Sequence, residues 1–313
     1  MSLLRSARNL APFLVSLAAI AYLVATVDLR AAFGRMDSQA ALVLIPALLV
    51  YGALSLVIEA MTLVRLVPDG ENNFNIWTAS RVKAASYLMN LIHYALGAGA
   101  LALLLRRRAG IGVIESAGVV ILIMMFDLGM LLVMVAIGIT LLSAETPEVR
   151  VGLILILIGA ICGGFALLRA PFSLGPLEGL RSHRLFRAAR TTPAERLLET
   201  GALRLLFVLC FLGLGWAAFS AFGLAVPLGD FVVRFSAVAL AATLPSVAGI
   251  GPSQVGMVEL FSPFSDREAL LACSLALSAG LILLRIGIGL LFAREYAREA
   301  YAASQETEAE TSR

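Results

Sequence analysis

Three charged side chains lie inside or near long apolar runs of this sequence: Asp127, Arg285 and Glu59. If these runs cross a membrane, each charge is costly in hydrocarbon and is a functional candidate by default. Arg285 is suited to receive a phosphate, and Asp127 or Glu59 is suited to take up a proton. A purely structural ion pair between Asp127 and Arg285 is the alternative. Glu59 could equally extend to the membrane surface beside Arg65.

A second group of candidates lies in the apolar run 231–262, which proline and glycine interrupt at its centre. A helix cannot continue through such a cluster, because proline lacks an N–H donor and glycine relaxes the backbone. We expect a re-entrant hairpin whose return helix begins deep in the membrane, with N–H groups that suit a phosphate or carboxylate. A tight turn that only packs on neighbouring helices is the alternative. The candidate substrate-binding residues here are Gly249, Gly251, Ser253 and Gln254.

The run 84–105 is predicted as a second re-entrant hairpin. Each arm would have about 11 residues, or about 16 Å of helix, which reaches mid-bilayer but does not cross it. Asn90 and His93 lie near its expected tip and are candidates for headgroup contact. A hydrogen-bonded structural histidine is an equal alternative for His93.

Motifs for catalysis or metal binding are missing from the sequence. Residues 80–83 fit the pattern S-x-x-K, but its partner motifs are lacking and chance explains the match. Three cysteines lie far apart in apolar segments and form no metal or disulfide pattern: Cys162, Cys210 and Cys273. We therefore predict no enzyme activity, no metal and no cofactor. The energy source would be an ion gradient or the lipid gradient itself.

The composition defines the elements that position these residues. The 313 residues are 60% hydrophobic and 14% charged, with a mean hydropathy of +0.93, which is typical of a polytopic helical membrane protein. We predict an all-α fold with six full spans and two re-entrant hairpins, as one transmembrane domain over 1–302 and a disordered cytoplasmic tail over 303–313. The apolar runs are 10–27, 40–64, 84–105, 113–142, 150–169, 201–226, 231–262 and 269–293.

Arginine positions set the predicted orientation. The chain has 23 arginines and a single lysine, Lys83. With a cytoplasmic N-terminus and both broken runs as hairpins, 18 cationic residues lie inside and 5 outside. If 84–105 crossed instead, ten of them would move to the wrong side. We therefore expect an inverted-repeat protein of the plasma (inner) membrane, with both termini cytoplasmic.

The loop 170–200 is predicted to be basic and cytoplasmic. Its arginines recur every third residue over 181–190, a pattern that fits an interfacial helix facing anionic lipid or an ordinary basic loop. The sequence Thr192-Pro193-Ala194-Glu195 is typical of a capping box that starts the next span.

In this order of elements, the chain resembles the transmembrane region of lysylphosphatidylglycerol synthases, whose stand-alone members are proposed lipid flippases. The family has a Leu-Pro and then a Gly-Gly-Leu-Gly where this chain has Leu244-Pro245 and Ala248-Gly249-Ile250-Gly251. Met125-Phe126-Asp127 loosely matches its Glu-Arg-x-x-Asp span, and Leu284-Arg285 matches an arginine of its last span. The sequence contains no aminoacyl-transferase domain, so the resemblance does not imply lipid aminoacylation.

Two departures from the family concern its acids. Gln254 stands where the family usually has a glutamate after the glycines. The first hairpin has Ala95-Leu96-Gly97-Ala98-Gly99-Ala100 in place of the family's Pro-Gly-x-x-Gly-Glu. If those acids couple transport to protons or contact the substrate, this chain would work differently or would not transport.

Three functions remain open at this level. The first is a secondary transporter, or flippase, that moves an anionic phospholipid or a lipid-linked phosphate across the bilayer. The second is a non-transporting partner of a lipid- or glycan-processing membrane system. The third is an intramembrane enzyme acting on lipid headgroups. Expected partners are a membrane lipid and either a second copy or another membrane protein, with no nucleic acid.

Overall fold

The computed structural model describes residues 19–35, 37–67, 74–92, 94–141, 178–181, 183–244 and 251–311, together with isolated positions at 17 and between 151 and 169. Within these ranges the regular structure is helical and contains no strand. The elements are α2 (Leu29–Gly34), α3 (Ser38–Leu66), α4 (Ile76–Ile92), α5 (Tyr94–Ala109), α6 (Val113–Leu141), α8 (Glu178–Arg181), η2 (Arg184–Phe186), α9 (Arg187–Thr191), α10 (Ala194–Ala221), α11 (Leu228–Ala241), α12 (Pro252–Phe261) and α13 (Arg267–Thr311).

Among the described residues, four helices are long and apolar enough to cross a membrane: Ser38–Leu66, Val113–Gly138, Ala194–Ala221 and Arg267–Phe292. They correspond to four of the six predicted spans and make the protein a multi-pass membrane protein. Of the other two predicted spans, 10–27 is described at residue 17 and from residue 19 onward, where it is helical, and most of 150–169 lies outside the described residues.

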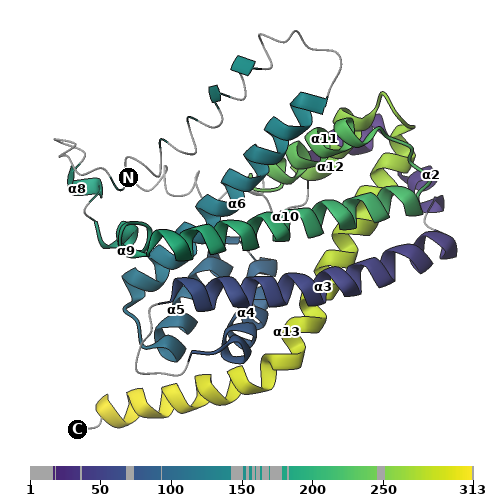
Figure 1. Cartoon of the computed structure of the whole chain (residues 1–313). Helices are drawn as coiled ribbons and strands as arrows, with labels where there is room; N and C mark the ends of the chain where they lie inside the picture. Colours follow the sequence, from purple (N-terminus) through teal and green to yellow (C-terminus); the bar gives the residue numbers. More distant parts are fainter. Residues whose placement is uncertain are drawn as a thin grey trace, which may run out of the picture.

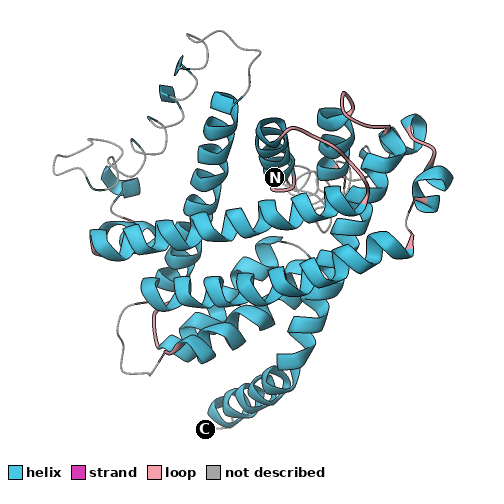
Figure 2. Ribbon diagram, turned by 45° about the vertical axis from the view of Figure 1, so that its right-hand side comes forward, coloured by secondary structure: helices cyan, strands magenta, loops and turns pink. Residues whose placement is uncertain are grey.

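The fold is built around α3 and α10, which lie side by side along much of their length (Figures 1 and 2). The first half of α3 packs into one apolar core with α10 to α13, and its second half packs into another with α4, α5 and α6. The first core is rich in rings: Phe231 stacks on Phe235 at 5.0 Å, and Phe219 meets Phe261 edge-on at 4.8 Å. Two cores on one helix allow the two broken runs to occupy different ends of the molecule.

The broken runs each form two shorter helices; the second run divides at its glycine and proline cluster, whereas the first divides between Ile92 and Tyr94, and its glycines Gly97 and Gly99 lie inside α5. α4 and α5 have 17 and 16 residues, or about 25 Å each, so the first pair extends beyond the predicted 84–105. α4 begins before residue 84 because the Asn75 side chain accepts a hydrogen bond from the Thr78 amide at 2.9 Å and so caps the helix. The polar residues of the first turns then continue the helix. α12 lies within the predicted 231–262, and α11 begins three residues before that run, at Leu228. Re-entry from opposite sides remains a prediction.

The described part of the predicted basic loop, 178–181 and 183–200, is largely helical. α8, η2 and α9 lie within it, and α10 begins at Ala194, as the sequence predicted. The Thr192 hydroxyl instead donates to the Ala188 carbonyl at 2.7 Å, so the predicted side-chain cap is not formed. The stretch 181–190 is not one interfacial helix but short pieces that pack on α6, where Leu185 approaches Gly118.

The C-terminal end also differs from expectation. α13 continues to Thr311, whereas the sequence predicted a disordered tail over 303–313. The residues there are mostly alanine, glutamate and glutamine, which have high helix propensity and can extend a helix that is already formed.

Candidate functional site

A buried carboxylate on α3 joins this helix to α4. Glu59 is 8% exposed and forms an ion pair with Lys83, whose Nζ lies 2.8 Å from Glu59 Oε1. The Tyr87 hydroxyl, one turn further along α4, donates to the other carboxylate oxygen. Arg65 pairs with Glu199 on α10 at 3.0 Å. Glu59 therefore turns into the protein rather than toward the membrane surface beside Arg65.

A second ion pair joins α10 to α6; its arginine is buried and its aspartate is partly exposed. Arg204 is 1% exposed, and its Nη1 lies 3.2 Å from an Asp127 carboxylate oxygen. Its Nη2 donates to Thr62 on α3 at 3.0 Å, and its guanidinium lies 4.8 Å from the Phe207 ring centroid. The Arg204 Nε has no hydrogen-bond partner in the described part of the chain. The cation–π contact with the Phe207 ring offsets part of the free-energy cost of burying this N–H group without a hydrogen bond.

The partner of Asp127 is thus Arg204, and the structural pair with Arg285 considered from the sequence is not formed. Sequence reasoning assigned Arg204 to the basic cytoplasmic loop. It missed the pair with Asp127 because the pair depends on how α10 packs on α6. Arg204 lies ten residues, or about 15 Å, into α10, which begins at Ala194.

The two pairs and Arg285 interact electrostatically. The charges of Arg204 and Lys83 both act on Glu59 and on Asp127. Arg285 is exposed on α13, and its charge acts on Tyr87 and on Tyr51 of α3. Four helices therefore contribute to one polar region, with α13 beside it.

The tip of the second helix pair is a separate polar site. Gly251 has φ 117°, a conformation that favours glycine, and its N–H donates to Gln254 Oε1 at 2.6 Å. The Ser253 hydroxyl donates to the same oxygen at 3.0 Å, and Gln254 Nε2 donates to Ser278 on α13 at 2.9 Å. Gln254 is fully buried. The site thus contains the predicted residues Gly251, Ser253 and Gln254, but Gln254 already satisfies one of the amides expected to bind an anion.

Exposed polar contacts connect the α12–α13 turn to the N-terminal helices, at the end of the molecule that the predicted orientation places outside the cell. Tyr22 donates to Glu259 of α12 at 2.7 Å, and Arg267 pairs with the same carboxylate. These hydrogen bonds from Tyr22 and Arg267 hold the pKa of the Glu259 carboxyl below its ordinary value. Arg35 pairs with Asp266 at 2.9 Å. The turn between α12 and α13 is thereby fastened to the N-terminal helices.

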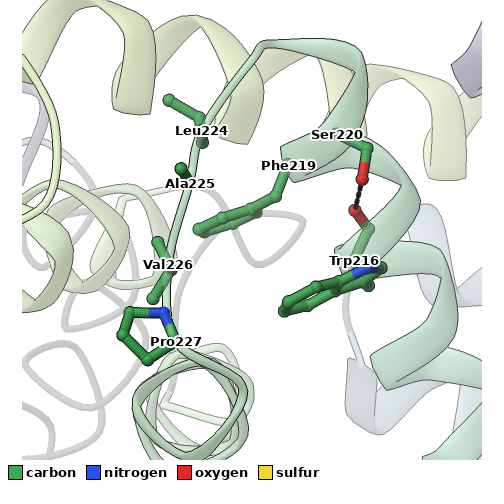
Figure 3. Close-up of a pocket in the computed structure, with 7 residues that line it drawn as sticks. All are labelled: Trp216, Phe219, Ser220, Leu224, Ala225, Val226 and Pro227. Atoms are coloured by element: carbon green, nitrogen blue, oxygen red, sulfur yellow. Dashed lines mark hydrogen bonds between the residues drawn. The ribbon is translucent and has the colours of Figure 1, made fainter.

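An apolar cavity of about 450 Å³ lies where α10 joins α11 (Figure 3). Its single side-chain hydroxyl, Ser220, donates to the Trp216 carbonyl at 3.0 Å. The cavity is at least twelve residues, or about 18 Å, along α10 from Arg204. Its chemistry suits hydrocarbon and offers nothing for a phosphate. It is lined by Trp216, Phe219, Ser220, Leu224, Ala225, Val226 and Pro227.

The remaining predicted site residues are not placed. Gly249 and His93 lie outside the described residues, and Asn90 lies in α4 with no description of its side chain. Within the part of the chain that is described, no group of three or more His, Cys, Asp or Glu side chains is arranged to hold a metal.

Long apolar helices with ion pairs buried between them define a polytopic membrane protein with a polar interior. Residues 9–293 match the family described as the lysylphosphatidylglycerol synthase TM region, and the chain belongs to this family. The resemblance read from the sequence is confirmed, and it associates the protein with lipid handling. No curated protein and no solved structure matches the chain.

Proposed function

We propose that the protein is a secondary transporter that moves an anionic phospholipid or lipid-linked phosphate between the two leaflets. The observation that carries this proposal is Arg285, an exposed cation in the apolar part of α13. A cation at that depth is costly unless it meets a counter-ion, and a lipid phosphate is an anion that membranes supply.

Arg285 lies between the two polar sites along one helix. Ser278, which binds Gln254, is seven residues before Arg285 and shares its helix face about 10 Å away. Gly289, four residues after Arg285, packs on Leu88 of α4, which also carries Lys83. A headgroup moving along α13 would therefore pass from the second hairpin to Arg285 and then to the Glu59–Lys83 pair.

The remaining parts of the proposal concern the membrane arrangement. The helix pairs α4–α5 and α11–α12 would enter from opposite sides, giving an inverted repeat in the plasma (inner) membrane with cytoplasmic termini. Substrate sites at broken helices of such repeats are typical of secondary transporters. We propose no chemical turnover of the lipid.

A non-transporting partner of another membrane protein is the second candidate. The observation that favours it is Gln254, which stands where the family usually has an acid and is fully engaged by Gly251, Ser253 and Ser278. In this case the hairpin tip would be a packing element without a substrate.

Reconstituted liposomes separate these functions. The purified protein is inserted into liposomes containing fluorescent phosphatidylglycerol, and inward or outward movement is followed by quenching of the outer leaflet. We expect wild-type protein to move the lipid and Arg285→Gln to reduce the rate at least about tenfold, since losing a charged hydrogen bond costs about 1.5–3 kcal/mol. Headgroup analysis after the assay should show unchanged lipid.

The matched control is Arg187→Gln. Arg187 is an exposed arginine that pairs with Glu115 at the predicted cytoplasmic end of α6, away from α13, and its loss should leave the rate unchanged. Absence of lipid movement by folded wild-type protein would support the partner function, and altered headgroups would support an enzyme.

A further inference from the structure

The two buried ion pairs use different cations. Arg204 makes contacts with Asp127, Thr62 and the Phe207 ring, and a guanidinium keeps its proton and its fixed fork geometry. The other pair contains Lys83, the only lysine in a chain with 23 arginines. A lysine ammonium is a point charge on a flexible side chain, so it can exchange one anionic partner for another. An arginine guanidinium has donors in a rigid planar arrangement, so it keeps the partners that match this geometry.

Glu59 is enclosed by charged and titratable groups from each helix packed around it. Lys83 and Tyr87 contact it directly from α4. The charges of Arg204 on α10 and Asp127 on α6 belong to the same network, but these two are paired with each other. Arg285 on α13 acts on Tyr87. The exchangeable members of the network are therefore Glu59 and Lys83.

We propose that Glu59 and Lys83 couple lipid binding to proton uptake, and this rests on the proposed transport function. A proton from water adds to the Glu59 carboxylate, and its ion pair with Lys83 is lost. The Lys83 ammonium then pairs with a phosphate oxygen of the lipid headgroup. No covalent bond to carbon, nitrogen or phosphorus is made or broken, and the proton ends on a Glu59 oxygen.

The charge balance selects the class of substrate. Before binding, the ammonium and the carboxylate sum to zero; afterwards the ammonium, a neutral carboxylic acid and a phosphodiester with a single negative charge also sum to zero. At the Glu59–Lys83 pair, which lies beyond Arg285 on the proposed path, a phosphomonoester or pyrophosphate with two or more negative charges would carry more charge than Lys83 balances, which is costly in the membrane. The site therefore favours a phosphodiester lipid such as phosphatidylglycerol, carried electroneutrally with a proton.

Protonation also changes how the helices are held. The ion pair and the Tyr87 hydrogen bond both connect α4 to Glu59 on α3. Neutralising Glu59 removes the ionic part of this connection while the fixed pair of Arg204 and Asp127 still joins α10 to α6. Proton uptake would thus free α4, an arm of the first helix pair, without loosening the rest of the bundle.

Proton uptake on lipid binding tests the coupling directly. Full-length protein in neutral detergent is titrated with phosphatidylglycerol in weak buffer containing a pH indicator, and affinity is measured in parallel at several pH values. We expect uptake of about one proton per bound lipid and an affinity that falls by up to about tenfold per pH unit as pH rises. Phosphatidylcholine, which carries no net charge, is the control lipid.

The matched variants are Glu59→Gln and Glu199→Gln. Glutamine imitates the protonated acid, so Glu59→Gln should bind phosphatidylglycerol without proton uptake and with affinity independent of pH. Glu199 forms a more exposed carboxylate–arginine pair between α3 and α10, and its substitution should leave proton uptake as in wild type. Proton uptake that persists in Glu59→Gln would overturn the proposal. Wild-type affinity that does not change with pH would overturn it even if the variant failed to fold.

The liposome assay distinguishes this coupling from transport itself. If wild-type protein moves lipid with the same pH profile as Glu59→Gln, the coupling is wrong and the transport function stands. If wild-type protein takes up a proton on binding lipid but moves none in liposomes, the linkage at Glu59 stands and the transport function fails.

Discussion

At the scale of single residues, the protein carries two kinds of buried polar contact. Arg204 and Asp127 form a pair with fixed partners, while Glu59 shares its two oxygens between a lysine and a tyrosine. A buried charge left without its partner costs far more than the pair contributes. Substitutions at these residues should therefore separate structural pairing from substrate binding.

Asp127→Asn and Arg204→Gln test the fixed pair. Asp127→Asn leaves the buried Arg204 charge unpaired, which in soluble proteins costs about 3–5 kcal/mol, whereas Arg204→Gln leaves Asp127, whose side chain is 31% exposed, and should cost less. We expect each variant to unfold at a lower temperature, and the double variant to recover much of the loss. Thermal unfolding in detergent measures this, and additive losses in the double variant would contradict the pairing.

Gln254→Ala tests the tip of the second helix pair. It removes the acceptor of the Gly251 amide and the donor to Ser278, leaving buried groups unsatisfied at about 1–3 kcal/mol each. The unfolding midpoint should fall clearly. Ser262→Ala, which removes an exposed hydroxyl bonded to the Glu259 carbonyl, is the control and should change it little.

At the scale of helices, close backbone approaches and surface tethers set how the elements meet. η2 approaches α6 most closely at Gly118, where an added Cβ would lie 2.4 Å from the Leu185 carbonyl oxygen. The turn between α12 and α13 is held instead by polar side chains. These two contacts predict different responses to substitution.

Gly118→Ala should separate η2 from α6. The new methyl group collides with backbone, which cannot rotate away as a side chain can, and overpacking of this kind costs about 1–3 kcal/mol. Gly213→Ala on α10 is the control, since an added Cβ there meets nothing within 4 Å. Equal unfolding temperatures for the two variants would show that η2 does not pack on α6 as described.

The Glu259 tether should respond to pH. Because its folded pKa is lowered, Glu259 contributes stability above its ordinary pKa of 4.5, and this contribution is lost as pH falls through the lower folded value. We expect Glu259→Gln to lower the unfolding temperature at neutral pH and to match wild type in strong acid. A difference that stays constant down to that acid range would contradict the tether.

At the scale of the whole molecule, the distribution of arginine predicts the orientation in the membrane. Single cysteines at positions 107 and 187, in a background without Cys162, Cys210 and Cys273, should react with a membrane-impermeant reagent only from the cytoplasm. The positive-inside bias is the physical reason. Reaction from the outside at either position would contradict the predicted topology.

The sequence by itself determined the class, the family and the position of most helices. Long apolar runs are buried in a membrane rather than exposed to water, and the cluster of proline and glycine in 231–262 interrupts its helix, so the spans and the division of the second broken run follow from local chemistry. The first run divides between Ile92 and Tyr94, and its glycines Gly97 and Gly99 lie inside α5. Asp127 and Glu59 were identifiable because a charge in an apolar run is conspicuous. Helix ends were less predictable: α4 begins well before the apolar run because polar residues also fit a helix.

Only the tertiary structure decided which charges meet. Arg204 lies near the start of an apolar run, where sequence reasoning places it with the basic loop, and its pairing with Asp127 depends on how α10 packs against α6. Lys83 likewise lies in the polar first turns of α4 and becomes a buried partner of Glu59 only because α4 packs on α3. Ion pairs between helices depend on the rotation and register of both helices, and a single sequence specifies neither until the packing is known.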